Sequence, residues 1–290
     1  MEEKLLEIKD LSVEYTTDED IVKAVNHVSL TLNKGETIGL VGETGAGKTT
    51  LALSLMRLLP KVSGRITGGE IMFNGEDLVK ADEEDMRKVR GEKISMIFQD
   101  PMTSLNPVLT VGNQIGEALE LHMDLTPEEK QERIEEMLKL VGIAESRKKD
   151  YPHQFSGGMK QRVVIAMALA CKPELLLADE PTTALDVTIQ AQILDMMQEL
   201  KEKINTSIIL ITHDLGVVAS SCSRIIVMYG GQIMETGTVE DIFYSPLHPY
   251  TIGLLQSIPK AGGSRERLSS IAGTPPDMLK PPTGCPFFPS

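Results

Sequence analysis

The chain has 290 residues, with 29 lysines and arginines against 42 aspartates and glutamates, which gives a net charge of −13. Hydrophobic residues make up 41% of it, which excludes a disordered chain, and the length allows one large or two small domains. The acidic balance argues against a nucleic-acid partner, because binding to a phosphate backbone requires a basic surface. Three scattered cysteines, Cys171, Cys222 and Cys285, make no disulfide framework and favour a cytosolic setting.

The sequence predicts no membrane-spanning segment. Its longest apolar stretch covers residues 163–171, whereas a spanning helix needs about 20 apolar residues. The first four residues, MEEK, lack the basic-then-apolar order of a signal peptide. Composition therefore indicates an acidic intracellular protein and leaves its function open.

The spacing of apolar residues predicts a mixed α/β fold. Strands are expected at residues 5–15, 25–32, 37–41, 70–73, 93–98, 175–178, 207–212, 224–229 and 232–236. A helix is expected to start near Lys48, and the pairs at 74–75 (NG) and 230–231 (GG) are expected to form turns.

Residues from about 100 to 165 are predicted to be helical. Thr126 to Glu129 form a capping-box pattern with Pro127 at the first helical position, and Gly142 is a candidate for the helix end. Beyond residue 237 the chain is rich in proline and glycine, and we expect a loosely built extension. The predicted organisation is a strand-rich core at 1–99 and 166–236, a helical insertion at 100–165 and an extension at 237–290.

The strongest motif is the segment GETGAGKTT at residues 42–50, which fits the phosphate-loop pattern GxxxxGK[ST] between a strand and a helix. Glycines let backbone N–H groups converge on phosphate oxygens, and the helix adds its positive end. Lys48 would place a charge at the β- and γ-phosphates, and the Thr49 hydroxyl would bind Mg²⁺. The residues expected to contact the nucleotide here are Gly42, Glu43, Thr44, Gly45, Ala46, Gly47, Lys48, Thr49 and Thr50.

Two further apolar strands end in polar residues. LLLA at 175–178 is followed by Asp179 and Glu180, and IILIT at 208–212 is followed by His213. Asp179 is placed to hold Mg²⁺, and Glu180 to orient or deprotonate the attacking water. His213 is expected at the carboxyl ends of the strands, where it could contact the γ-phosphate. A helix-capping acid and a structural histidine are the alternatives that these patterns leave open.

A third motif, FSGGMKQR at residues 155–162, precedes an alanine-rich helical run at 163–171. Ser156 is a good helix N-cap, and the two glycines leave the backbone open to a ligand. With this motif, the order of signals resembles that of ATP-binding subunits of ABC transporters over roughly residues 5–240. The resemblance implies a P-loop ATPase core with an antiparallel β subdomain, a helical insertion and an irregular C-terminal extension.

The resemblance also implies two subunits that face head to tail. The ATP on the phosphate loop of one subunit would then be contacted by Ser156, Gly157 and Gly158 of the other. The common family signature reads LSGGQ, whereas this chain has FSGGM, which keeps the serine and both glycines that touch phosphate.

Other positions match family residues one by one. Tyr15 matches the aromatic residue that stacks on adenine, with a strand-end tyrosine as the alternative. Gln99 matches the glutamine that reaches Mg²⁺ and the attacking water. Asp186 lies in the segment that matches the loop across the dimer seam, where we expect a structural or communicating role. The implied catalytic residues are Glu180, His213, Gln99 and Lys48.

Several stretches resemble the dipeptide/oligopeptide subfamily of importer ATPases, which also includes nickel-uptake subunits. They are QDPMTSLNP at 99–107, the FSGGM signature, residues 178–194 and HPYTIGLL at 248–255. Many members close with a cysteine-rich loop that holds an iron–sulfur cluster, and GCPFFP at 284–289 resembles its start. Because such clusters take four thiolates, Cys285 would bind a [4Fe–4S] cluster only in a longer form of the chain. A protein without the cluster, with Cys285 as a free thiol, is the alternative.

The resemblance therefore implies an ATPase that powers the import of di- or oligopeptides, with ATP and Mg²⁺ as cofactors. The expected partners are a second, similar ATP-binding subunit or a second copy of this chain, transmembrane permease subunits and, indirectly, an extracellular substrate-binding protein. The expected location is the cytoplasmic face of the cell membrane. The alternatives are the same role for nickel or another small solute, a soluble ABC ATPase, and a regulatory module with a degenerate site.

Overall fold

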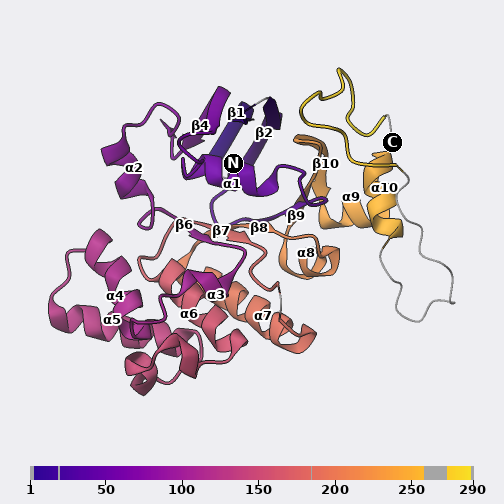
Figure 1. The fold of residues 1–290 in the computed structure, drawn as a ribbon. Helices are drawn as coiled ribbons and strands as arrows, with labels where there is room; N and C mark the ends of the chain where they lie inside the picture. Colours follow the sequence, from indigo (N-terminus) through magenta and orange to yellow (C-terminus); the bar gives the residue numbers. More distant parts are fainter. Residues whose placement is uncertain (1–2, 19, 184, 258–272, 289–290) are drawn as a thin grey trace, which may run out of the picture. The chain divides into compact units, whose positions relative to one another are not determined.

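The computed structural model describes residues 3–18, 20–183, 185–257 and 273–288 (Figure 1). Its contacts divide the chain into two compact units, residues 1–81 with 211–290 and residues 82–210. Each unit is described separately below. The three-part division expected from the sequence stays a prediction.

The first unit contains two groups of strands and several short helices. Its elements are β1 (Lys4–Thr16), β2 (Ile21–Asn33), β3 (Thr37–Val41), α1 (Lys48–Leu55), β4 (Gly64–Phe73), β5 (Glu76–Asp77), α8 (Leu215–Ser221), β9 (Arg224–Tyr229), β10 (Gln232–Thr238), α9 (Val239–Tyr244) and α10 (Pro249–Gln256).

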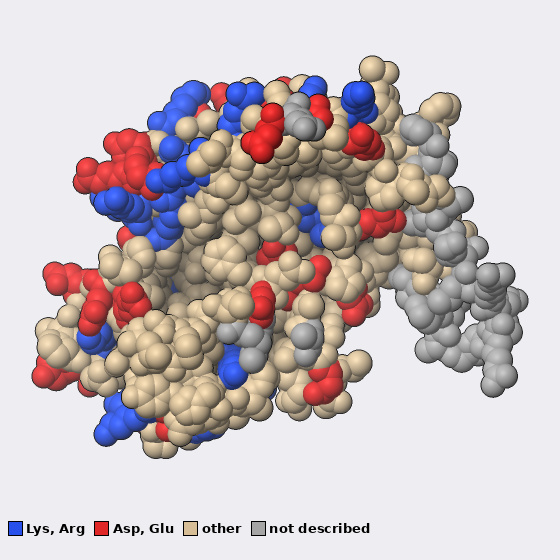
Figure 2. All heavy atoms as spheres, viewed as in Figure 1, with Lys and Arg blue, Asp and Glu red and all other residues tan. Residues whose placement is uncertain are grey.

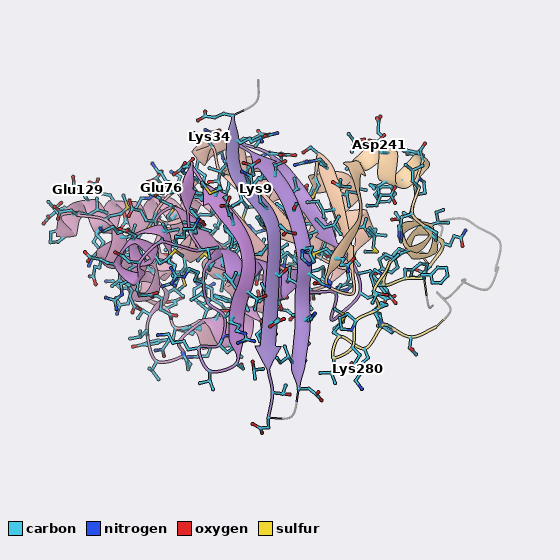
Figure 3. The ribbon with its side chains drawn as sticks, turned by 90° about the horizontal axis from the view of Figure 1, so that it is seen from above. Lys9, Lys34, Glu76, Glu129, Asp241 and Lys280 are labelled. Carbon is cyan, nitrogen blue, oxygen red and sulfur yellow. The ribbon has the colours of Figure 1, made fainter. Side chains whose placement is uncertain are left out.

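An antiparallel sheet in the order β2-β1-β4-β5 forms one group. Figure 3 shows its long strands side by side, with Lys9 on β1. A register shift between Ile8 and Leu11 interrupts the alternation of β1, and Leu6, Ile8, Leu11 and Val13 are all buried. The sheet turns at Asn74 and Gly75, whose φ angles of 50° and 85° are those of the expected tight turn.

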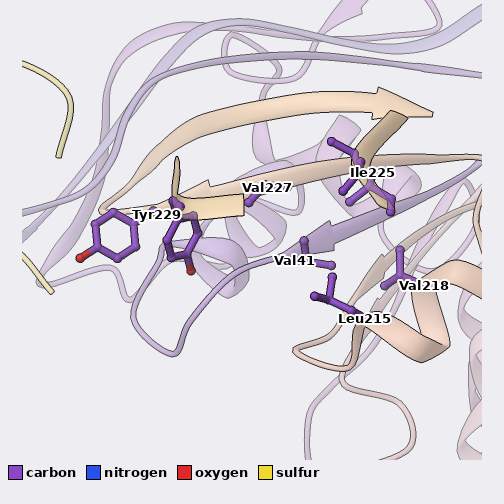
Figure 4. Close-up of a cluster of buried hydrophobic side chains, with 8 residues drawn as sticks. Val41, Leu215, Val218, Ile225, Val227 and Tyr229 are labelled. Atoms are coloured by element: carbon purple, nitrogen blue, oxygen red, sulfur yellow. The ribbon is translucent and has the colours of Figure 1, made fainter. Parts of the chain in front are cut away.

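The second group of the first unit consists of β3, β9 and β10, with β3 and β9 parallel and β9 and β10 antiparallel. Every residue of β3 is buried, as is typical of a strand covered on both faces. A hydrophobic cluster packs against these strands and includes Val41, Val218, Val227 and Tyr229 (Figure 4). It continues into the C-terminal extension through Ile242 and Tyr250.

The extension is more ordered than the sequence analysis predicted, because it begins with α9 and α10. Thr238 and Asp241 form a reciprocal capping box at the start of α9, where Figure 3 labels Asp241. Pro249 occupies the first turn of α10, a position that proline favours. Residues 273–288 then follow without helix or strand, as expected for the tail. The stretch 258–272 lies outside the described residues.

The second unit holds a parallel strand pair and most of the longer helices. Its elements are α2 (Glu83–Val89), β6 (Ile94–Ile97), α3 (Pro101–Ser104), α4 (Val111–His122), α5 (Pro127–Leu140), η1 (Glu145–Lys149), η2 (Pro152–Gln154), α6 (Gly157–Leu169), β7 (Leu175–Asp179), α7 (Val187–Ile204) and β8 (Ser207–Ile211), whose last residue belongs to the first unit.

The strands of this unit lie in the order β8-β7-β6, and β6 and β7 are parallel. The capping box predicted at Thr126 and Glu129 is present at the start of α5, and Gly142 follows its end with a φ of 73°. The alanine-rich run predicted to reach residue 171 ends earlier, because α6 stops at Leu169 and Cys171 lies beyond its cap, Ala170.

Charged side chains complement the helix dipoles in this unit. α2 starts with three acidic residues and ends with Arg87 and Lys88, and Figure 2 shows acidic and basic side chains next to one another on the visible face. Within the part of the chain that the structure describes, no helix combines the length and the hydropathy needed to cross a bilayer.

Candidate nucleotide-binding site

The phosphate loop predicted at residues 42–49 connects β3 to α1 in the first unit. Lys48 is 7% exposed, and its ammonium group is held inside the loop. Nζ donates hydrogen bonds to the carbonyl oxygens of Gly42, at 2.7 Å, and Glu43, at 2.8 Å. A buried ammonium needs such partners, so the loop fixes a positive charge where the sequence predicts phosphate.

Two glycines of the loop have no room for a side chain. Gly42 has a φ of 150°, and a Cβ there would come within 2.1 Å of the Met228 carbonyl oxygen. Gly47 has a φ of 95°, and a Cβ there would come within 2.4 Å of the Ala24 carbonyl oxygen. Left-handed backbone and close backbone approach together explain why only glycine fits at these positions.

The start of α1 is suited to bind an anion. Gly47 is its N-cap and provides no side-chain cap, so the first N–H groups of an eight-residue helix are not capped by a side chain there. Such groups, with the positive end of the helix dipole, form a general phosphate site. Thr49 and Thr50 lie in this first turn, and the Tyr15 hydroxyl at the end of β1 donates to Thr50 Oγ1 at 3.3 Å.

The loop is braced by segments distant in sequence. Gly231, in the turn between β9 and β10, donates its N–H to the Ala46 carbonyl oxygen at 3.2 Å and accepts from the Asn26 N–H at 2.8 Å. The Glu43 N–H donates to the Tyr250 hydroxyl at 3.0 Å. Neither Gly231 nor Tyr250 was predicted to be a site residue, since no local pattern connects them to residues 42–49.

His213 also lies in the first unit. It lies two positions after the last residue of β8, Ile211, and is exposed. The next residue, Asp214, caps α8 by accepting from the Gly216 N–H at 2.8 Å. The predicted position at the end of a buried strand is therefore correct. Its predicted contact with the γ-phosphate stays a prediction.

In the second unit, β7 ends at Asp179, which is 2% exposed, and Glu180 follows with a φ of 47°. A left-handed φ is uncommon for a residue other than glycine and is often found at functional sites. Glu180 Oε2 accepts hydrogen bonds from Gln99 Nε2 at 3.1 Å and from Thr183 Oγ1 at 2.8 Å. The structure thus brings together Gln99 and Glu180, two of the residues predicted to act on water.

The Ser-Gly-Gly motif begins α6, as predicted. Ser156 is the N-cap, and its hydroxyl accepts from the Met159 N–H at 3.4 Å. A Cβ at Gly157 would make only an ordinary contact, with Leu185 Cδ2 at 3.9 Å, whereas a Cβ at Gly158 would come within 2.7 Å of Ile189 Cγ2 on α7. Asp186 caps α7 by accepting from the Ile189 N–H at 3.0 Å, which is the structural role expected for it.

The cysteines do not fit an iron–sulfur cluster. Cys285 is exposed, with its Sγ 3.6 Å from His248 Nε2. Cys171 belongs to the other unit, and burial raises the pKa of its thiol. Among the described residues, no three His, Cys, Asp or Glu side chains form a group that could hold a metal ion. Three cysteines in the whole chain are too few for a cluster with four thiolates.

The structure has the features of a P-loop ATPase of the ATP-binding cassette class. These are a strand followed by a glycine loop with a buried lysine, a helix start without a side-chain cap, and a strand with two acids at its end. The model of the family "ABC transporter" matches residues 25–183, more than half of the chain, and the model of the "Oligopeptide/dipeptide transporter, C-terminal region" matches residues 234–290. The chain belongs to the ABC transporter family.

Curated relatives align over almost the entire chain. It is 54% identical to the dipeptide transport ATP-binding protein DppD of Bacillus subtilis, covering 98% of this chain and 86% of the relative. It is 56% identical to the oligopeptide transport ATP-binding protein OppD of the same organism, covering 98% and 80%. Identity to OppD of Escherichia coli is 53%, covering 98% and 85%.

Solved structures share the fold. One is an ATP-binding cassette captured as a dimer in a post-hydrolysis state with ADP and phosphate, with a TM-score of 0.72, 30% identity and coverage of 81% of this chain and 98% of that one. Another is a subunit of an ABC transporter complex from Clostridium perfringens, with a TM-score of 0.73, 27% identity and coverage of 84% and 92%.

Proposed function

We propose that this chain binds ATP with Mg²⁺ on residues 42–50, hydrolyses it within a pair of cassettes, and thereby powers the import of di- or oligopeptides. The observation that carries the proposal is the buried Lys48 ammonium, held by the carbonyl oxygens of Gly42 and Glu43 in a loop with no room for side chains at two of its glycines.

The chemistry of three side chains suits an Mg²⁺ nucleotide. The Thr49 hydroxyl and the buried Asp179 carboxylate are oxygen ligands of the kind that Mg²⁺ prefers, and Gln99 would add an amide oxygen. When bound, the ion neutralises charge that develops on the phosphate oxygens. Lys48 stabilises the same charge from the loop, and His213 is assigned to a γ-phosphate oxygen.

Glu180 is the proposed general base. It takes a proton from water while the water oxygen bonds to the γ-phosphorus and the bond to the bridging oxygen of ADP breaks. Gln99 donates to the same carboxylate and so positions it. The exposed fraction of Glu180 is intermediate, which leaves the carboxylate within reach of water.

Ser156, Gly157 and Gly158 would contact the ATP of a second cassette, and Tyr15 would stack on adenine. A solved relative of the same fold forms a dimer, which supports the pairing. The second cassette is a similar ATP-binding subunit or another copy of this chain. Permease subunits would hold the pair at the cytoplasmic face of the membrane, with an extracellular binding protein supplying peptide.

The peptide assignment rests on the curated relatives, whose names state dipeptide and oligopeptide transport, and on the matching C-terminal region. It is tested in vesicles that contain the permease and a second ATP-binding subunit, by following hydrolysis and the accumulation of labelled peptide. We expect both to require the peptide-loaded binding protein and to disappear in Lys48→Ala. Accumulation of nickel instead of peptide would replace the cargo and leave the ATPase assignment intact.

A [4Fe–4S] cluster is proposed only for a longer form of the chain in which further cysteines join Cys285. Iron analysis of an anaerobically purified longer form tests it. A Cys285→Ser variant of that form is expected to lose the iron, and unchanged iron content would remove Cys285 from the ligand set.

A further inference from the structure

Tyr250 belongs to the C-terminal extension, yet its hydroxyl lies at the phosphate loop. Its side chain is fully buried, and its oxygen accepts the hydrogen bond from the Glu43 N–H, a residue 207 positions earlier in the chain. Glu43 is the second residue of the loop and one of the two whose carbonyl oxygens hold Lys48 Nζ. The Glu43 N–H shares its peptide group with the Gly42 carbonyl, whose oxygen accepts from Lys48 Nζ at 2.7 Å. Tyr250 therefore anchors a peptide group that orients the lysine.

The tyrosine ring is enclosed by two other rings from separate segments. Tyr229, the last residue of β9, has its ring centroid 4.5 Å from that of Tyr250, and Phe287 of the tail has its centroid 5.4 Å away. Phe287 also contacts the Tyr229 ring edge-on at 5.5 Å. Packing on two sides fixes the ring, so the hydroxyl presents its oxygen to Glu43 in one position.

The start of α10 is fixed as well. Glu235 of β10 accepts hydrogen bonds from the Leu247 N–H at 2.7 Å and the His248 N–H at 3.0 Å. His248 caps the helix, its Nδ1 accepting from the Tyr250 N–H at 3.1 Å. These bonds hold the backbone at Tyr250, while the two rings and the Glu43 N–H hold its side chain.

From these contacts we infer that Tyr250 is a positioning residue of the nucleotide site, through which the C-terminal extension sets the affinity of the phosphate loop for ATP. The inference rests on the proposed function of the loop. Without the hydroxyl, the partly buried Glu43 N–H loses its partner, and the loop must shift to satisfy it. That shift moves the carbonyl that orients Lys48. Because a partly buried donor without a partner is costly, we expect ATP binding to weaken about 5- to 30-fold.

The test is Tyr250→Phe in the full chain, which removes only the hydroxyl and keeps the ring. ATP affinity is measured by calorimetric titration with Mg²⁺ present, together with the melting temperature. Tyr244→Phe makes the same change at an 85% exposed position of the extension and must leave ATP affinity unchanged. Ile242→Val trims the same hydrophobic cluster without touching the loop, so it is expected to lower the melting temperature and leave ATP affinity unchanged.

Lys48→Ala separates the inference from the function on which it rests. If Lys48→Ala loses ATP binding while Tyr250→Phe binds ATP within twofold of the parent protein, the inference is wrong and the function stands. Undiminished binding by Lys48→Ala would instead overturn the proposed function. A second outcome would also overturn the inference. Ile242→Val and Tyr250→Phe could lower the melting temperature equally and weaken ATP binding equally. The role of Tyr250 would then be structural only.

Discussion

The side-chain amide of Gln99 donates a hydrogen bond to the carboxylate of Glu180, although 81 positions separate the two residues. Their meeting follows from the register of β6 and β7, in which Ile97 is paired with Ala178 in parallel. Gln99 and Glu180 each lie two positions beyond this pair. A parallel pair of strands thus presents an amide and a carboxylate together where both strands end.

Replacing Glu180 by glutamine should stop hydrolysis without preventing ATP binding. The amide oxygen can still accept from Gln99 and Thr183, but it cannot take the proton of the attacking water. We expect turnover to fall about 10²- to 10⁴-fold, the range that a positioned base contributes. Phosphate release and ATP titration are the two measurements. Near-normal turnover would remove Glu180 from the role of base.

Alanine at Gly47 should destabilise the first unit more than alanine at Gly45. Both glycines have positive φ angles, 95° and 84°, so each substitution strains the backbone by roughly 1–2 kcal/mol. Only at Gly47 would the new Cβ also meet a backbone oxygen, at 2.4 Å, while Gly45 has open space. Unfolding in urea, without nucleotide, compares the two. Equal losses of stability would mean that the Ala24 carbonyl moves aside at little cost.

Acidification should weaken the contacts that hold the start of α10 against β10. Burial lowers the pKa of His248 below its ordinary value of 6.5, and the nearby Glu235 opposes this. The folded state then binds fewer protons than the unfolded state, so the contribution of His248 is complete above pH 6.5 and is lost as the pH falls through its lower folded pKa. A proton on Nδ1 would also remove the acceptor for the Tyr250 N–H.

The groups facing His248 are Glu235 from β10, Cys285 and Phe287 from the tail, and Tyr250 on its own helix. Burial raises the pKa of Glu235, but its hydrogen bonds lower this pKa by a larger amount, so the net shift is downward from 4.5. The stability that Glu235 contributes is therefore lost only at more acidic pH, below 4.5. Urea midpoints between pH 7 and pH 5 are the measurement. His248→Asn supplies a helix cap without a titrating ring, so its urea midpoint should depend less on pH than that of the parent protein. An equal dependence of the midpoint on pH in both proteins would contradict this prediction.

Asp186 should behave as a helix cap. Asp186→Ala removes the acceptor for the Ile189 N–H and is expected to lower the free energy of unfolding by about 0.5–2 kcal/mol, whereas Asp186→Asn should keep most of it. Chemical denaturation gives these values, and the ATPase rate is followed in parallel. A stable Asp186→Asn variant that had lost hydrolysis would show that the carboxylate has a chemical role.

Local patterns predicted much of this fold. The apolar runs of β3, β6, β7 and β8 end next to the polar residues that define the site, and both features are contiguous in the sequence. The helix caps at Ser156 and Thr126 were likewise predicted from a few neighbouring residues and are confirmed.

Three features were missed, and only one of them depends on distant segments. The Thr238 and Asp241 capping box is a local signal for α9, but proline and glycine around it suggested an irregular extension. The left-handed φ of Glu180 could not be inferred, because residues other than glycine rarely adopt it. Nothing near Tyr250 indicates a contact with Glu43, since that contact requires β9, α10 and the tail to pack together first.

The brace between Tyr250 and Glu43 gives the order of synthesis a functional meaning. A ribosome produces β3, the loop and α1 early, and Tyr250 follows Glu43 by 207 residues. At bacterial and eukaryotic elongation rates that interval lasts roughly 10 to 40 seconds. During it, the nascent chain carries every residue of its phosphate loop without the tyrosine that steadies the loop. If Tyr250 sets the affinity of the loop as inferred above, tight ATP binding is delayed until nearly the whole cassette has been translated.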